Sequence, residues 1–378
     1  MMKGFVIEGL GYANFFARIT AGLSESERKK IAFFVRDDEA FNFITQRAPS
    51  CQLYRIPDRA KVPTPEEIAQ NKPVLFKRIH QDIIKSFEHL MGGADYEQCW
   101  RCYFSTLLYF SHVIKELNIT KLIMCSGCGI YSKAAATASY ILQIETRFTE
   151  LANLPEKVFI DPQGTNASSL LAAQPELLDE YPEVDPIKHH RWMKKYVEEK
   201  RKVIPQALGN PRSELIKQIS QQTILDSGKN FIFLPLQVSN DAQLWMYAKH
   251  KNQDAITYAV KCATEKGCTL AVKIHPAEMS EEEIVLVGKL SAELGFYLTQ
   301  ESTNALIQAA ESVITINSTV GLEAMLYNKQ VEVLGDCFYK HFDVSRLQKY
   351  IHHYLFSDVH FFGNTKINRK TAQAFLAR

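Results

Sequence analysis

This sequence of 378 residues has neither a strong excess of one charge nor a long apolar run. Its 44 Lys and Arg are nearly balanced by 42 Asp and Glu, which leaves a formal net charge of +2. A dedicated nucleic-acid-binding protein carries a marked basic excess, so we expect no nucleic-acid partner. No run reaches the roughly 18 apolar residues of a membrane span, and the first residues lack the apolar core of a signal peptide. We therefore expect a cytoplasmic protein, with room for a basic patch that would hold it at the inner face of the cytoplasmic membrane.

Cysteine is present in eight copies, and four of them form two C-x-x-C pairs, Cys99 with Cys102 and Cys125 with Cys128. On spacing alone these pairs could bind zinc, as in a zinc-dependent regulator. The first pair, however, lies inside a long helical periodicity, and the second lies between a strand and a helix. We therefore expect buried free thiols in a reducing cytosol and no metal site.

Strands alternate with helices in both halves of the chain, a pattern typical of parallel sheets with crossover helices. Runs such as KIAFFV in the first half and NFIFLPL in the second are the strands, and the Pro-rich stretch 57–75 is expected to be a loop. Residues 171–228 carry no strand signal. We predict an α/β fold of two Rossmann-like domains, residues 1–170 and 229–378, joined by a helical connection at 171–228. Two such halves suit a glycosyltransferase of the GT-B type.

Ligands of open α/β sheets bind beyond the carboxyl ends of the strands, so the loops that follow strands are the candidate sites. After the strand FIFLPL come Gln237, Asn240 and Asp241, which could also be a simple helix N-cap. After the next strand, Lys273 and His275 alternate on one side of the chain and suit a phosphate or a carboxylate. The alternative for this pair is an exposed strand end with incidental charges.

A third loop in the second half joins a strand to a helix that begins with hydroxyl side chains. It contains Asn317, Ser318 and Thr319, and the N–H groups at such a helix start bind phosphate well. Glu323, one turn further along, could accept hydrogen bonds from a ribose. The alternative is an ordinary serine cap. Three polar loops after neighbouring strands nevertheless favour one common nucleotide site.

The first half offers a second group of candidates after its strands. The segment 11–18 follows the first strand and lacks the full G-x-G-x-x-G pattern, so a dinucleotide is not expected. Further on, Glu150 precedes a turn rich in Asp, Gly and Asn, for which an ordinary turn is the alternative. The candidates for binding an acceptor or sugar are Tyr12, Asn14, Arg18, Asp161, Asn166 and Ser168.

Taken together, these motifs resemble those of the bacterial capsule polysaccharide synthesis proteins, a group of retaining β-Kdo transferases of capsule-linker and O-antigen assembly. The resemblance rests on Gly11–Arg18, on Glu150 with the turn from Asp161 to Asn166, and on three more specific motifs in the second half. Those three are LPLQVSND at 234–241, KIHP at 273–276 and NSTVGLEA at 317–324. The family commonly has Glu-x-Gly where Glu150 is followed here by Leu151 and Ala152, a departure that concerns the acceptor more than the donor.

The resemblance implies a donor and a division of labour. The donor would be CMP-Kdo, with a glycan or glycolipid acceptor and no further cofactor. Lys273, His275 and the helix start at Ser318 would take up the negative charge of departing CMP without a metal. Asp241 would be the nucleophile and Glu150 the base for the acceptor hydroxyl, or Asp241 would only steady the sugar cation during front-side attack. The alternatives are another nucleotide sugar, such as CMP-sialic acid or a UDP-sugar, and a non-catalytic assembly scaffold.

A basic helix from Lys188 to Lys202 lies in the predicted connection. We expect it to face an anionic partner such as a membrane surface, because basic residues near anionic lipid favour binding. The alternative is a solvated helix face.

Overall fold

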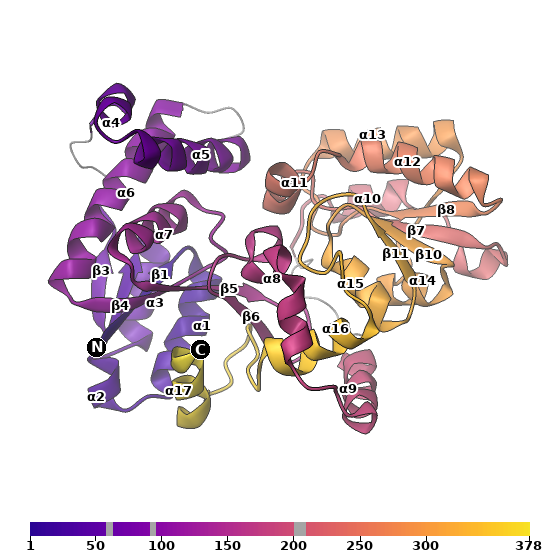
Figure 1. Cartoon of the computed structure of the whole chain (residues 1–378). Helices are drawn as coiled ribbons and strands as arrows, with labels where there is room; N and C mark the ends of the chain where they lie inside the picture. Colours follow the sequence, from indigo (N-terminus) through magenta and orange to yellow (C-terminus); the bar gives the residue numbers. More distant parts are fainter. Residues whose placement is uncertain (58–62, 91–95, 200–208) are drawn as a thin grey trace. The chain divides into compact units, whose positions relative to one another are not determined.

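The computed structural model describes residues 1–57, 63–90, 96–199 and 209–378. The chain forms two compact units, one of Met1–Tyr181 with Tyr350–Arg378 and one of Pro182–Lys349. Figure 1 shows the helices and strands of both units, coloured by their position in the sequence. Each is a sheet covered by helices, and each is described here by itself.

The first unit is built on a seven-stranded sheet in the order β12-β6-β5-β4-β1-β2-β3. The strands β1 to β5 pair in parallel, whereas β5 with β6 and β6 with β12 pair antiparallel. The bounds are β1 (Met2–Ile7), β2 (Ile31–Val35), β3 (Gln52–Arg55), β4 (Ile119–Met124), β5 (Glu145–Leu151), β6 (Lys157–Asp161) and β12 (Phe356–Ser357).

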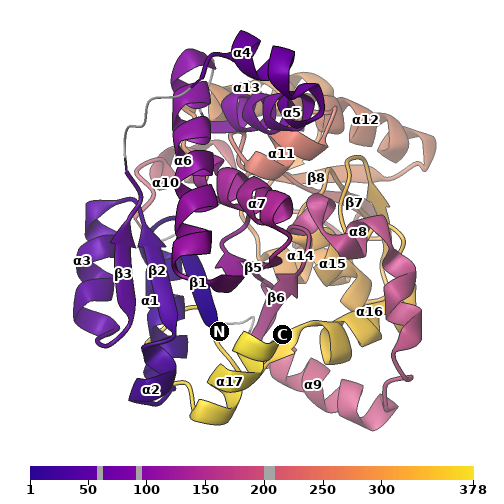
Figure 2. The ribbon, with the colours of Figure 1, turned by 60° about the vertical axis from the view of Figure 1, so that its left-hand side comes forward.

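Helices cover both faces of this sheet, because successive side chains of its central strands point to opposite sides. Phe5 of β1 packs in one apolar cluster with α1 (Leu10–Ala21), α3 (Asp38–Arg47) and α17 (Arg369–Ala377). Val6 packs in another with α5 (Pro73–Leu90), α6 (Tyr96–Glu116) and α7 (Ile130–Leu142). Figure 2 shows α5, α6 and α7 together on one side of the sheet. The short helices are α2 (Glu25–Arg28), α4 (Pro65–Asn71) and α8 (Leu170–Ala173).

The second unit has a five-stranded, fully parallel sheet in the order β11-β10-β7-β8-β9. The strands are β7 (Phe231–Pro235), β8 (Thr269–Lys273), β9 (Tyr297–Leu298), β10 (Ser312–Thr315) and β11 (Gln330–Val333). One face packs against α10 (Ser213–Ile219), α12 (Asn252–Glu265) and α13 (Glu281–Leu294), and the other against α14 (Thr303–Ala309) and α15 (Thr319–Leu326). The remaining helices are α9 (Pro186–Glu199), α11 (Ala242–Tyr247) and α16 (Val344–Lys349).

The predicted fold class, α/β with two Rossmann-like sheets, is confirmed. Two details differ from the expectation of purely parallel sheets and of a loop at 57–75. The edge strands β6 and β12 run antiparallel. The helix α4 lies within 57–75 and begins with a capping box, in which Thr64 accepts from Glu67 N–H and Glu67 accepts from Thr64 N–H.

The end of the chain belongs to the first unit, so the predicted C-terminal domain of 229–378 extends too far. The side chain of Arg18 in α1 donates to the backbone carbonyls of His360, Phe361 and Thr365 at 3.0–3.1 Å. Phe361 also stacks on Phe15, with ring centroids 4.9 Å apart. The local sequence of the last 29 residues does not indicate that they pack on the first unit, because this packing depends on partners about 340 positions away.

The predicted connection, 171–228, is likewise divided between the units at Tyr181 and Pro182. It contains no strand among its described residues, as expected. Its helix α9 is part of the second unit, since Tyr196 is buried and donates to Glu323 of α15 at 2.9 Å. The last part of the predicted basic helix, from residue 200 to Lys202, lies outside the described residues.

Candidate functional site

Three loops follow the adjacent strands β10, β7 and β8 in the second unit, and two buried amides join the first two of them. The Gln237 Nε2 donates to Asn317 Oδ1 at 2.9 Å, and the Asn317 backbone N–H donates to Gln237 Oε1 at 3.1 Å. The Asn317 Nδ2 also donates to the carbonyl of Gln243. Both side chains were predicted to bind the donor directly. The structure shows that they fix the shape of the loops, and direct binding of the donor stays a prediction.

Asp241 follows this loop as the N-cap of α11. Its carboxylate accepts from Gln243 N–H at 2.7 Å, and its own N–H donates to the carbonyl of Val238. The sequence predicted that Gln237 and Asn240 orient this carboxylate. That is wrong for the described structure, because Gln237 binds Asn317 and Asn240 is exposed. The cap explains why an acid lies here, and it leaves the second carboxylate oxygen of a half-buried side chain for other chemistry.

Lys273 and His275 lie at the end of β8, and both are largely buried. The Lys273 Nζ donates to the backbone carbonyl of Glu301 at 2.6 Å. Burial lowers the pKa of Lys273 to about 8, against a smaller opposing effect of Glu301. Burial also lowers the pKa of His275, although Asp241 and Glu278 act to raise it. The charge of Asp241 therefore acts on the imidazole of His275.

The tautomer of His275 follows from its neighbour. The Ala277 backbone N–H donates to His275 Nδ1 at 3.1 Å, so the neutral ring carries its proton on Nε2. No partner for Nε2 occurs among the residues that the structure describes. His275 is therefore a neutral donor at neutral pH, and Lys273 beside it is a cation that gains from a bound anion.

Glu278 was missed by the sequence reasoning, although it is one of the most buried acids in the described chain, with 2% of its surface exposed. It accepts from the N–H groups of Ser239, Met279 and Ser280 at 2.6–2.9 Å and from the Ser239 hydroxyl at 3.0 Å. It thereby ties the loop after β7 to the loop after β8. An acid three residues after a His at a strand end, in the run HPAE, was the available signal.

The loop after β10 leads into α15 with Ser318 as its N-cap, accepting from Val320 N–H at 3.2 Å. Thr319 begins the helix, and Gly321 in its first turn packs against Tyr339. A Cβ at Gly321 would lie 2.6 Å from the Tyr339 hydroxyl, so a larger residue would push the two apart. Glu323, predicted to meet a ribose, is 9% exposed and accepts from Tyr196 in this structure.

In the first unit, Glu150 lies near the end of β5 and accepts from the Tyr12 hydroxyl at 3.1 Å. The structure thus brings together two residues that the sequence predicted separately. A third acid, Glu8 at the end of β1, was missed. Its carboxylate accepts from Ser132 N–H at the start of α7, and burial raises its pKa. A Cβ at Gly129 would lie 1.8 Å from Glu8 Oε2, so this acid requires a glycine at position 129.

Several other predicted site residues of the first unit bind the backbone of their own unit. The Asp161 carboxylate is fully buried and accepts from the N–H groups of 163, 164, 170 and 171 and from the Tyr354 hydroxyl. Arg18 binds the C-terminal segment, and Asn14 donates to the carbonyl of Gly363. All three therefore have a structural role in this unit, and their predicted sugar-binding role stays a prediction. Ser168 donates to the carbonyl of Thr165, and Asn166 is half-buried in the same turn, with φ +49°.

The cysteines of the two C-x-x-C pairs lie in different elements. Cys99 and Cys102 are in α6, and Cys125 and Cys128 are in the loop between β4 and α7. All eight cysteines are free thiols. Across the described ranges, no group of three or more His, Cys, Asp or Glu side chains is placed to hold a metal ion. The same ranges contain no helix of the length and apolarity that crossing a bilayer requires.

The sequence of the second unit is similar to that of a known protein family. Residues 179–354 match the model of the capsule polysaccharide biosynthesis proteins. Over these residues the chain is similar to the capsule polysaccharide biosynthesis proteins. The matched segment contains the whole second unit, including all three loops with Asp241, Lys273 and Ser318.

Curated relatives match this chain over parts of their length. The chain is 32% identical over 122 residues to "Protein FixF" of Sinorhizobium fredii, which is 31% of this chain and 29% of that protein. It is 26% identical over 174 residues to "Capsule polysaccharide export protein KpsS" of Escherichia coli, which is 42% of this chain and 44% of that protein. The matches thus span less than half of either relative.

Solved structures match with low identity. The β-Kdo 2,7 transferase KpsC of Thermosulfurimonas dismutans has a TM-score of 0.41 at 15% identity, covering 71% of this chain and 89% of that chain. A UDP-GlcNAc 2-epimerase of Methanocaldococcus jannaschii, solved with UDP-GlcNAc and UDP, has a TM-score of 0.36 at 12% identity, covering 100% and 99%.

Proposed function

We propose that this protein is a retaining glycosyltransferase that moves Kdo from CMP-Kdo to a glycan or lipid-linked acceptor. The observation that carries the proposal is the grouping of polar side chains after adjacent strands: a half-buried Lys273 at the end of β8, His275 with no partner for its Nε2–H in the described residues, and Asp241 after β7, whose charge acts on His275. A half-buried cation and an N–H donor suit a phosphate that gains charge as its bond to the sugar breaks.

In the proposed reaction, an oxygen of the Asp241 carboxylate attacks the anomeric carbon of Kdo. The bond from that carbon to the phosphate oxygen breaks, and CMP leaves with the electron pair. Lys273 and the Nε2–H of His275 stabilise the charge on CMP, with the N-terminus of α15 as a further donor. Since these groups supply the positive charge, we expect no metal requirement.

The second half of the proposed reaction transfers the sugar onward. The acceptor hydroxyl attacks the same carbon, the bond to Asp241 breaks, and two inversions give net retention. We assign Glu150 as the base that takes the hydroxyl proton, with Tyr12 as a positioning residue that donates to it. Glu8, whose raised pKa favours its protonated form, is the nearby acid that could return a proton.

A donor assay tests this proposal. Purified protein is incubated with CMP-Kdo, CMP-sialic acid or UDP-GlcNAc, and release of the nucleotide is measured with and without glycan or lipid acceptors. Of the three donors, we expect only CMP-Kdo to release its nucleotide. We also expect CMP to raise the melting temperature of the protein, because it binds the folded state. His275→Ala should remove most of that rise, whereas the exposed Asn240→Ala should keep it. Release of nucleotide from UDP-GlcNAc instead would show that the donor is a UDP-sugar and not CMP-Kdo. No release from any of the three donors would favour the alternative of a non-catalytic scaffold.

A further inference from the structure

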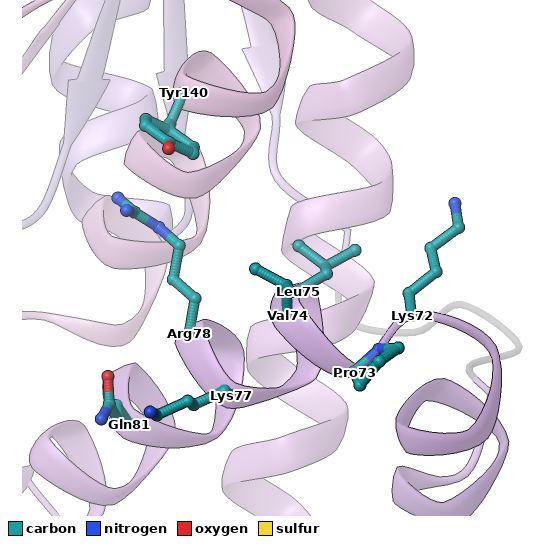
Figure 3. A pocket seen from close by; sticks show the side chains of 8 residues that line it. All are labelled: Lys72, Pro73, Val74, Leu75, Lys77, Arg78, Gln81 and Tyr140. Atoms are coloured by element: carbon teal, nitrogen blue, oxygen red, sulfur yellow. The ribbon is translucent and has the colours of Figure 1, made fainter.

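A groove on the first unit is lined by none of the residues to which the proposed reaction assigns a role. Its main hollow, of about 630 Å³, is lined by Lys72, Val74, Lys77, Arg78, Tyr140 and their neighbours. A second hollow of about 660 Å³ adjoins it and shares Arg78 and Tyr140. Figure 3 shows these side chains arranged along the start of α5 and the end of α7.

The sequence of α5 produces two different faces. Ile79 and Ile83 are fully buried in the apolar cluster with α6. Val74, Lys77 and Arg78 lie on the opposite, exposed face, because residues three and four apart share one side of a helix. Val74 is 85% exposed, which is unusual for a large apolar side chain at a helix start and leaves apolar surface beside the cations.

The end of α7 contributes the other wall. Tyr140 is 65% exposed and Ile141 is 44% exposed. The Arg78 guanidinium lies 4.1 Å from the centre of the Tyr140 ring, a cation–π contact that holds both side chains at the surface. The aromatic ring, the aliphatic side chains and the cations therefore form one patch.

No carboxylate lines either hollow in the described part of the chain. Asp82, the acid nearest to this face along α5, is turned inward. It accepts from the Tyr103 hydroxyl at 3.2 Å and from the Thr137 hydroxyl at 3.1 Å. The three cations at 72, 77 and 78 are thus not neutralised by an acid of the groove, and the patch is complementary to an anionic surface.

We propose that this groove docks the protein on an anionic phospholipid bilayer. Lys72, Lys77 and Arg78 would meet headgroup phosphates, while Val74 and Tyr140 would enter the interfacial layer, where exposed aromatic rings are favoured. This assigns membrane contact to α5 and α7, whereas the sequence pointed to the basic helix α9. In α9 the aromatic Tyr196 is buried within the second unit, and the hollow beside Lys194 contains the acid Glu198.

Vesicle flotation tests the docking with three proteins. Wild-type protein is mixed with vesicles of phosphatidylcholine alone or of phosphatidylcholine and phosphatidylglycerol in equal parts. The groove variant changes Lys72, Lys77 and Arg78 to Gln. The matched control makes the same change at three exposed lysines of the second unit, Lys249, Lys266 and Lys289. All six side chains are exposed, so both variants should keep the wild-type melting temperature.

We expect wild-type and control proteins to float only with the anionic vesicles, and raised salt to release them. The groove variant should lose affinity by about tenfold or more, since each basic residue near anionic lipid favours binding. Val74→Ser should lower affinity while leaving all charges in place. Equal flotation with neutral vesicles, no flotation of wild type, or an equal loss in the control variant would each overturn the proposal. None of these outcomes depends on the donor, so this test and the donor assay fail independently.

Discussion

Both units of this protein carry charged site candidates in segments at or after the ends of strands, but they use them differently. In the first unit, Arg18 and Asp161 bind backbone groups of their own unit, with three carbonyls for the arginine and four N–H groups for the aspartate. In the second unit, Lys273 makes one backbone hydrogen bond and His275 accepts one, so each has donors left for a ligand. A charged residue at a strand end is thus a strong site candidate only when the fold leaves part of it unsatisfied.

The largest expected effect tests the second unit. Asp241→Asn should lower Kdo transfer by several orders of magnitude, because an amide cannot act as a covalent nucleophile. Asn is as good an N-cap as Asp, so α11 and the fold should survive. Initial rates with CMP-Kdo measure the loss, and the melting temperature with CMP is the control for folding and nucleotide binding.

Intact-mass measurement of the wild-type protein after mixing with CMP-Kdo sharpens the same prediction. A Kdo-sized adduct should map to the peptide containing Asp241. An adduct on Glu150 would make Glu150 the nucleophile in place of Asp241. An active Asp241→Asn protein would show that Asp241 is not the nucleophile. An adduct on Asp161 would contradict the structure itself, since that carboxylate is fully buried among five donors.

The second effect tests the first unit. Asp161→Asn should destabilise it by about 3 kcal/mol or more, because the new amide NH₂ faces donors and leaves buried N–H groups unsatisfied. Tyr354→Phe, which removes only one of the five hydrogen bonds, should cost about 1 kcal/mol. Chemical unfolding followed by fluorescence measures both. An Asp161→Asn protein of wild-type stability that has lost activity would return Asp161 to the list of sugar-binding residues.

The fold was predictable to the extent that it depends on local pattern. The apolar run NFIFLPL, for example, forms the strand β7 as the sequence predicted. The structure places Asp241, Lys273 and Ser318 at the ends of adjacent strands, where the sequence predicted them, and their role as a binding site stays a prediction. The sequence could not predict which candidate residues have their hydrogen-bonding groups satisfied within the protein. Arg18 is satisfied by a segment about 340 residues away, and Glu278 becomes a link between two loops only when β7 and β8 pair.

The smallest effect distinguishes Lys273 from His275 by the pH dependence of CMP binding. Burial lowers the pKa of Lys273 to about 8, so the side chain loses its positive charge as the pH rises through that value. A bound phosphate favours the charged form, and CMP binding above this pH must therefore take up a proton. We expect CMP affinity to be constant below pH 8 and then to fall by at most about tenfold per pH unit. Titration calorimetry in two buffers of different ionisation enthalpy measures both the affinity and the proton uptake. Lys273→Gln should bind CMP more weakly and lose this dependence, while His275→Gln should keep it. If His275→Gln removes the dependence instead, the titrating group is the histidine and not the lysine.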